Sequence, residues 1–462
     1  REYKKGDSLR VYINYTARPE EIPIGGSVSI TSDKGLYFIN PDGKEAHKPK
    51  MIWTQGETQA SSAWFPTIDA PNQKTTQRIA ITVDTVFTTL SNGLKTNTIY
   101  NADGTRTDIW EQKLPHAPYL VMMVVGVFDV IKSSWKNKEV SYYVEPEYRK
   151  SSEKLFRETP EMIEFFSRIT GTPYPWDKYS QVVARDYVSG SMENTSATLH
   201  GDFMRMDERE MIDFDGDEYI SHELFHQWFG DLVTCESWSN LPLNESFASY
   251  GEYLWEEYRY GKAMADYHIY NDLQQYLGES RTKMVDMVRF NYNEREDMFD
   301  RHSYEKGACI LHMLRNYTGD EAFFSALKLY LQRNQFKSAE MHDLRLAFEE
   351  VTGEDLNWFF NQWFLGAGHP VLDIQYGWDD ATKKASLTVT QSQEGQNVAR
   401  IFELPLAVDI YEVSGKTRRE NIRVTKRSQT FTFDCPSKPA LINFDATKTL
   451  LCEKTDQHNA QE

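Results

Sequence analysis

The chain has 462 residues, which is enough for about two to four domains and for a core that needs no disulfide or metal to hold it together. Acidic residues outnumber basic ones by 69 to 51, which gives a formal charge of −18. Nucleic-acid binding needs a positively charged footprint, so this charge excludes nucleic acid as the expected partner. The four cysteines form no C-x-x-C pair, and neither a thiolate zinc site nor a redox motif is predicted.

The longest apolar run, from Tyr119 to Ile131, is interrupted by Gly126 and Asp129 and is rich in valine. A membrane helix needs about 20 apolar residues, so we interpret this run as a buried strand and expect no transmembrane segment. The protein is therefore expected to be soluble. Two locations remain open, the cytoplasm and the space reached by export after removal of a leader.

Residues 1–145 are predicted to form an N-terminal β domain. Alternating apolar and polar residues recur at 9–16, 80–87 and 140–144. Turn signals such as Asn92-Gly93 and Asp103-Gly104 lie between stretches of this kind. The pattern favours an antiparallel β-sandwich, and the domain is expected to be incomplete at its start.

The period changes to that of helices at about residue 150, and residues 146–368 are predicted to form an α-rich domain. An apolar stripe at helical spacing runs from Leu155 to Ile169 and ends before Gly171. A second stripe, at 341–351, ends at Gly353. Strand patterns return after Pro370 and predict a small β-sandwich domain at 369–455, followed by a tail at 456–462. The expected fold class is a multidomain α+β protein.

The main chemical motif is His222-Glu-Leu-Phe-His226. Residues four positions apart share one face of a helix, so the two imidazoles can bind one zinc ion, with nitrogens at about 2.0–2.1 Å. Glu223 is next to the first histidine and is suited to act on the water of the metal rather than on the metal itself.

A second helix is predicted to begin at Asn244, which is expected to act as its N-cap, and Glu245 is then on the first turn. Two histidines and one carboxylate leave the fourth tetrahedral position of zinc for water, which is typical of a catalytic site. We therefore predict one Zn²⁺ per chain, held by His222, His226 and Glu245. Glu252 shares a helix face with Glu245 and either orients a ligand from behind or is simply solvated.

Other candidate metal ligands are rejected. His302 and His312 have no partner at ligand spacing in the sequence. The segment 213–217 fails as a calcium loop because its glycine comes too early and the twelfth position is Leu224 instead of a glutamate. It is interpreted as an acidic loop that leads into the zinc helix.

Four motifs together resemble one known family. They are HELFHQWFG at 222–230 with LNESFA at 243–248, GSMEN at 190–194, TQGE at 54–57 followed by WFP at 64–66, and SYEKGA at 303–308. In this order the chain is similar to the aminopeptidase N family of gluzincin metallopeptidases. The resemblance implies a thermolysin-like catalytic domain at 146–368 and hydrolysis of the N-terminal residue of peptides.

The resemblance also implies roles for residues outside the zinc helix. Glu193 and Glu57, with help from Gln55, are expected to bind the free α-ammonium of the substrate, because carboxylates make charge-assisted hydrogen bonds with it. Tyr304 is expected to donate its hydroxyl to the oxyanion. Four further residues are expected to border the substrate or support its binding: Gly190, Ser191 and Met192 along the substrate backbone, and Asn194 behind them.

The sequence departs from the family pattern at two positions and in its length. Pro242 stands where the family usually has tryptophan, and Ser246 where it usually has glycine. Family members often end with a large helical domain that is missing here, which implies either a fragment of a longer protein or an unusually open member.

Three alternatives remain. A thermolysin-type endopeptidase would share the zinc site but would not need Glu193 and Glu57 together. An epoxide hydrolase on the same scaffold is disfavoured because the relative with that activity departs from glutamate at the position of Glu57. A binding protein on an inactive peptidase fold is disfavoured by the intact catalytic residues. The preferred N-terminal residue and the oligomeric state are not predicted.

Overall fold

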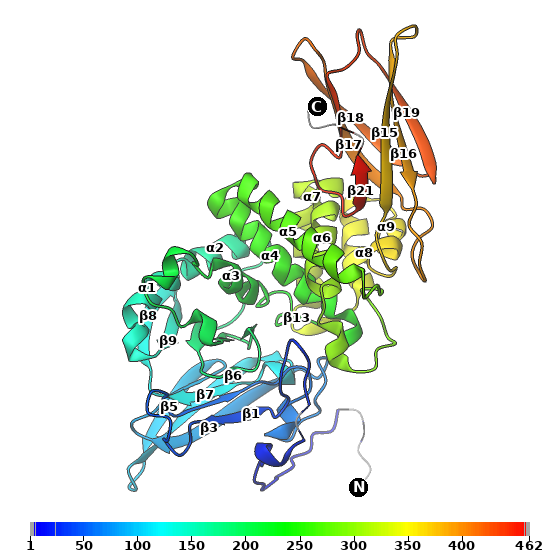
Figure 1. Cartoon of the computed structure of the whole chain (residues 1–462). Coiled ribbons are helices and arrows are strands. Elements are labelled where there is room, and N and C mark those ends of the chain that lie inside the picture. The colour runs from blue at the N-terminus through cyan, green and yellow to red at the C-terminus, as the bar shows by residue number, and fades with distance from the viewer. Residues whose placement is uncertain (1–3, 5, 24, 457, 459–462) are drawn as a thin grey trace.

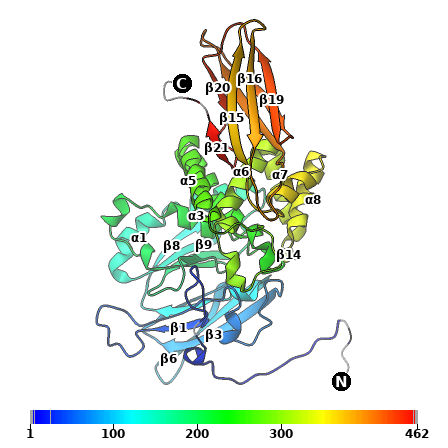
Figure 2. The ribbon, with the colours of Figure 1, turned by 45° about the vertical axis from the view of Figure 1, so that its right-hand side comes forward.

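A computed structural model describes residues 4, 6–23, 25–456 and 458. It shows a β region at the start of the chain, a helical region in the middle and a second β region at the end (Figures 1 and 2). This order confirms the predicted multidomain α+β class. No helix in the described part of the chain is long and apolar enough to cross a membrane.

The N-terminal region contains two antiparallel sheets. The first has the order β1-β2-β7-β4 and the second β3-β6-β5. Their strands are β1 (Leu36–Ile39), β2 (Met51–Thr54), β3 (Thr75–Asp84), β4 (Thr88–Ser91), β5 (Leu94–Tyr100), β6 (Thr105–His116) and β7 (Met123–Gly126). The turns predicted at Asn92-Gly93 and Asp103-Gly104 connect β4 to β5 and β5 to β6, and both glycines have positive φ. Trp53, Leu90 and Trp110 are buried in the core of this region.

Two strand predictions for this region were wrong. Residues 9–16 lie in none of the strands of the described chain, and Tyr12 and Ile13 remain 89% and 52% exposed. Alternation alone does not supply a partner strand, so the segment does not pair. The run from Tyr119 to Ile131 is not one strand, because the chain leaves β7 after Gly126 and begins β8 at Asp129.

The middle region begins with a five-stranded sheet of order β11-β12-β10-β9-β8. Its strands are β8 (Asp129–Trp135), β9 (Lys138–Val144), β10 (Lys178–Val183), β11 (Ser191–Met192) and β12 (Ala197–His200). Strands β9, β10 and β12 run parallel. Residues 129–144 thus belong to this sheet of the middle region. The prediction that the N-terminal domain extends to residue 145 was wrong for this segment. The sheet order also places β11, which carries the GSMEN segment, at an edge.

Helices dominate the rest of the middle region. They are α1 (Arg149–Leu155), α2 (Thr159–Ile169), α3 (Asp217–Phe225), α4 (Glu245–Tyr260), α5 (Lys262–Ser280), α6 (Gly307–Thr318), α7 (Asp320–Asn334), α8 (Met341–Thr352) and α9 (Asn357–Trp363), with the short parallel strands β13 (Val233–Cys235) and β14 (Lys337–Ala339). The stripe from Leu155 to Ile169 spans two helices instead of one, because α1 ends at Leu155 and α2 begins at Thr159, with Pro160 in its first turn. Gly353 ends α8 as predicted.

The C-terminal region consists of two sheets of order β19-β16-β15-β21 and β18-β17-β20. The strands are β15 (Val371–Asp379), β16 (Lys384–Gln391), β17 (Leu404–Tyr411), β18 (Thr417–Val424), β19 (Ser428–Asp434), β20 (Leu441–Phe444) and β21 (Glu453–Asp456). Val389 and Val408, one from each sheet, are fully buried. All four cysteines of the chain are buried and free. Of the predicted tail, residues 457 and 459–462 lie outside the described residues.

Candidate zinc hydrolase site

The motif His222-Glu-Leu-Phe-His226 lies on α3, as predicted, with His226 directly after its last residue. The backbone N–H of His226 donates to the carbonyl of His222 at 3.2 Å, so the helical path continues through the second histidine. Leu224 and Phe225 are fully buried and anchor the helix in the core. The two imidazoles therefore lie one turn apart on a fixed element.

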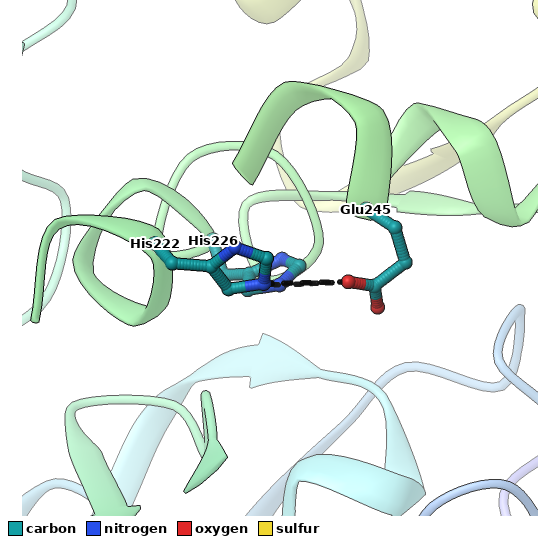
Figure 3. A group of neighbouring side chains, drawn as sticks. All are labelled: His222, His226 and Glu245. Atoms are coloured by element: carbon teal, nitrogen blue, oxygen red, sulfur yellow. Dashed lines mark hydrogen bonds and ion pairs between the residues drawn. The ribbon is translucent and has the colours of Figure 1, made fainter. Parts of the chain in front are cut away.

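Glu245, the first residue of α4, points at both histidines (Figure 3). The Nε2 atoms of His222 and His226 are 3.2 Å apart, and a carboxylate oxygen of Glu245 lies 3.5 Å and 3.3 Å from them. Two ligands at tetrahedral positions around zinc, each about 2.05 Å from it, are about 3.3 Å apart. The donor set and its spacing therefore fit a zinc ion.

Hydrogen bonds on the far side of each ring turn the Nε2 atoms toward this centre. The Nδ1 atom of His226 lies 3.0 Å from the carbonyl oxygen of Phe229, and Nδ1 of His222 lies 2.6 Å from Glu252 Oε1. Such contacts fix the tautomer and the orientation of a metal-binding histidine. Glu252 is only 9% exposed, so it is not the solvated side chain that the sequence left open.

A further histidine, which sequence reasoning did not identify, extends this chain of contacts. The Nε2 atom of His268 on α5 is 3.3 Å from Glu252, and Nδ1 is 3.3 Å from Glu256. Burial lowers the pKa of His268, but Glu252 and Glu256 outweigh burial and raise it to about 11. Its partners on α4 are remote in sequence, whereas Asp272, four positions further on, is a local neighbour at 3.6 Å.

Glu223 faces the same cavity and is 6% exposed. Its Oε2 atom has no hydrogen-bond partner among the described residues. Burial raises the pKa of Glu223 to about 8 against the opposing effect of His222 and His226. A carboxylate whose pKa lies near neutrality is suited to accept and return a proton.

Glu57 and Glu193 meet in this cavity from two different regions of the chain. Glu57 follows β2 and is 5% exposed, while Glu193 follows β11 and is 3% exposed. Burial, followed by the charge of Glu193, raises the pKa of Glu57, whose Oε1 has no partner in the described chain. Oxygens of both glutamates lie within 4.8 Å of each other and of one on Glu245. Two buried carboxylates at this spacing favour a cation between them.

Gln55 and Met192 are buried behind the cavity and are not among the residues that line it. The amide of Gln55 accepts from the hydroxyl of Tyr187 at 2.5 Å and lies 3.3 Å from the sulfur of Met192. Gln55 thus lies next to the GSMEN segment, but its amide already contacts Tyr187 and Met192. Gly190 and Ser191 do line the cavity.

The backbone at Gly190 is open, since a Cβ atom there would meet nothing within 4 Å. Ser191 bonds with His200 at 2.8 Å. Asn194 is fully buried, and neither amide atom has a hydrogen-bond partner in the described structure. Two residues that sequence reasoning did not single out contact Glu193 instead. The amide of Gln227 donates to the Glu193 carbonyl at 2.8 Å, and the hydroxyl of Tyr119 donates to the Glu193 carboxylate at 3.4 Å.

Tyr304 lies on a π-helical turn at His302–Lys306 and lines the same cavity. Its ring is nearly parallel to that of His222, with the centroids 6.0 Å apart. Burial, together with the negative charge of Glu245, raises the pKa of the phenol well above its usual value. The hydroxyl therefore keeps its proton and can donate a hydrogen bond.

The cavity that joins these groups has a volume of about 770 Å³. Carboxylates dominate its lining, including Glu218 on α3 and Glu296 beside Glu57. Glu296 is half-buried and accepts a hydrogen bond from the hydroxyl of Thr58 at 2.7 Å. The space is large enough for part of a peptide, and its charge favours a ligand with a positive end.

One minor prediction was wrong. Asn244 precedes α4 but its side chain does not cap the helix; its oxygen accepts from the N–H of Cys235 at 3.1 Å instead. His302 has two carboxylate neighbours, Glu279 at 2.9 Å, which is remote in sequence, and Asp300, two residues before it. Asp300 also pairs with Lys283 and Arg289, both at 2.7 Å, so this cluster is an ion-pair network that already contains its cations.

Three family models match the chain. The one described as the peptidase family M1 domain matches residues 155–363, and the one described as the peptidase M1 N-terminal domain matches residues 7–120. A domain of unknown function (DUF3458) with an Ig-like fold matches residues 368–444. These matches follow the order of the β region, the helical region and the second β region.

Known proteins with similar sequences are described as aminopeptidases. A probable aminopeptidase 1 of Saccharolobus solfataricus is 27% identical over 451 residues, which cover 96% of this chain and 56% of that protein. Human glutamyl aminopeptidase is 29% identical over 358 residues, which cover 75% of this chain and 37% of that protein. The chain thus spans about half or less of the length of these relatives.

A solved structure shares the fold. The crystal structure of Legionella pneumophila aminopeptidase A in complex with aspartic acid matches with a TM-score of 0.78 and 19% sequence identity. The match covers 92% of this chain and 49% of that one. The fold match therefore extends over all three regions of the present chain.

Proposed function

Because the chain belongs to peptidase family M1, we propose that it is a zinc-dependent aminopeptidase that removes the N-terminal residue of peptides. One observation carries the proposal. The cluster of His222, His226 and Glu245 opens into the same cavity as the buried pair Glu57 and Glu193. A zinc-type centre supplies hydrolysis, and an anionic pair beside it supplies recognition of a free ammonium group.

In this proposal His222, His226 and Glu245 hold the ion, with Glu252 orienting His222 from behind. Bound zinc would polarise the scissile carbonyl and lower the pKa of water. Glu223 accepts a proton from the attacking water and passes it to the leaving amine. Tyr304 donates its hydroxyl to the carbonyl oxygen as negative charge develops there.

Glu57 and Glu193 bind the α-ammonium of the substrate and thereby place the first peptide bond at the reacting centre. The open backbone at Gly190, next to Ser191 in the cavity lining, lets the peptide approach closely. A thermolysin-type endopeptidase would gain nothing from two buried carboxylates at this position. Because their charges repel, the pair is costly unless a cation binds between them, which favours an exopeptidase.

The test is to measure zinc content and turnover together. The purified chain is expected to bind one zinc ion and to hydrolyse chromogenic amides of free amino acids. A chelator should abolish turnover, and added zinc should restore it. A Glu245→Gln variant is the matched control, since it should lose zinc while the fold is kept. A protein loaded with one zinc ion that hydrolyses none of a panel of aminoacyl amides would refute the proposal.

A further inference from the structure

Ser246 lies next to Glu245 on the first turn of α4 and is completely buried. Its hydroxyl donates to the carbonyl oxygen of Ser303 at 2.7 Å. Ser303 directly precedes Tyr304 on the π-helical turn. We propose that Ser246 is a positioning residue for Tyr304, which fixes the phenol relative to the zinc-binding end of α4. The inference rests on the proposed function, in which Tyr304 acts on the carbonyl oxygen of the substrate.

Ser246 also packs closely against Gly307. A Cβ atom at Gly307, the first residue of α6, would lie 1.8 Å from the hydroxyl of Ser246 and 2.3 Å from its Cβ. Real Cβ atoms do not approach this closely, so any other residue at 307 would displace Ser246 or the turn. Ser246 thus occupies the space that Gly307 leaves free, directly after the turn that carries Tyr304.

Other hydrogen bonds join the turn at 302–306 to the residues that precede it in the chain. The backbone N–H groups of His302 and Ser303 donate to Asp300 at 3.0 Å and 3.1 Å, and the hydroxyl of Ser303 donates to the carbonyl of Met298 at 2.6 Å. These bonds tie the turn to the segment just before it. The Ser246 hydroxyl instead ties it to α4, the helix that begins with Glu245. Its loss would remove one hydrogen bond between the turn and the metal-binding helix.

The size of the expected effect follows from the role of Tyr304. Removing one oxyanion donor costs about 10²–10³ in kcat, and misplacing a catalytic group by 1 Å can cost about 10²-fold. A Ser246→Ala variant keeps the tyrosine but leaves the Ser303 carbonyl without this donor. We expect kcat to fall about tenfold, with KM nearly unchanged because the donor acts mainly in the transition state.

The decisive experiment is a double-mutant cycle with Tyr304→Phe. Ser246→Ala should lower kcat in the wild-type background and have almost no further effect once the hydroxyl of Tyr304 is gone. Ser280→Ala is the matched control, since Ser280 on α5 is also buried and donates to a backbone carbonyl, that of Leu277, at 2.9 Å. It should leave kcat unchanged. An equal loss from Ser246→Ala in both backgrounds would overturn the proposal.

Two measurements that do not depend on activity accompany the cycle. Zinc stoichiometry should be the same in wild type and Ser246→Ala, because Glu245 is untouched; loss of zinc would show that Ser246 acts through the metal and would overturn the proposal. Backbone hydrogen exchange in residues 302–307 should become faster in Ser246→Ala. Unchanged exchange would also overturn it. If zinc-loaded wild type hydrolyses no aminoacyl amide, the proposed function fails, whereas the exchange measurement still tests the contact.

A steric rescue tests the same contact from the other side. Gly307→Ala should lower kcat strongly, because the new methyl group collides with Ser246. Ser246→Gly removes the colliding atoms, and a Cβ at position 307 would then face the Cα of residue 246 at 3.1 Å, which is tight but reachable by a small shift. The double variant should therefore recover folding and part of kcat relative to Gly307→Ala. A Gly307→Ala protein with wild-type kcat, or a double variant no better than Gly307→Ala, would contradict the inference.

Discussion

The pair Glu57 and Glu193 predicts a conflict between stability and activity. Both carboxylates are nearly inaccessible, and burial followed by the charge of Glu193 raises the pKa of Glu57 above its ordinary value of 4.5. A carboxyl group of this kind ionises more easily in the unfolded chain, so it destabilises the fold as pH rises above about 4.5. Glu57→Gln removes the charge and keeps the shape. The variant should therefore be more stable than wild type at neutral pH, and the difference should disappear in acid.

The same substitution should impair catalysis. A hydrogen bond to a charged group contributes about 1.5–3 kcal/mol, and each 1.4 kcal/mol is a factor of ten. Loss of one charged partner of the α-ammonium thus corresponds to a kcat/KM about 10- to 150-fold lower. Glutamine still offers one oxygen, so the smaller end of this range is expected.

The assay combines thermal unfolding at neutral and acidic pH with turnover of one aminoacyl amide. Unfolding is followed in zinc-depleted protein, because the dication would offset the repulsion between the carboxylates. Glu296→Gln is the matched control; it removes one charge from the same cavity at a half-buried position and should change both quantities less. A Glu57→Gln protein that is less stable than wild type at neutral pH, or that keeps wild-type kcat/KM, would refute this reasoning.

Three further outcomes are expected. Glu223→Gln should keep zinc but lose about 10²–10⁴-fold in turnover, and near-normal turnover of the zinc-loaded variant would remove Glu223 from the mechanism. Tyr304→Phe should lower kcat by about 10²–10³ with little change in KM; a raised KM at constant kcat would make Tyr304 a binding residue. The pKa of His268 is raised from 6.5 to about 11, so its stabilising ion pairs are fully present below pH 6.5 and are lost as pH rises toward 11. His268→Gln should therefore destabilise the protein more at about pH 7.5 than at about pH 10.5 in chemical unfolding, and an equal or larger effect at the higher pH would contradict this assignment.

The sequence predicted the parts of the site that depend on local spacing. The helical period alone places His222 and His226 on one face. Glu245 was predicted as the third ligand at the start of the next helix, and the structure brings it to both histidines. The meeting of Glu57 with Glu193 was predicted only through the family resemblance, because the two residues come from different regions of the chain. No period or spacing connects them.

Features that depend on non-local packing could not be predicted. The pairing of β9 with β10 adds 129–144 to the middle sheet, although their alternation resembles that of the strands before them. The opposite error occurred at 9–16, where alternation is present but the segment pairs with no described strand. The contact of His268 with Glu252 and the fit of Ser246 against Gly307 exist only once the helices pack.

The proposed activity is cleavage of peptides at a free N-terminus by a zinc hydrolase site. The most direct measurement treats zinc-loaded wild type with one peptide and with its N-acetylated twin, and identifies the products by mass spectrometry. We expect the free peptide to lose its first residue and the acetylated twin, which offers no cation to Glu57 and Glu193, to stay intact. Equal cleavage of both peptides, or a cut at an internal bond, would contradict the proposed activity.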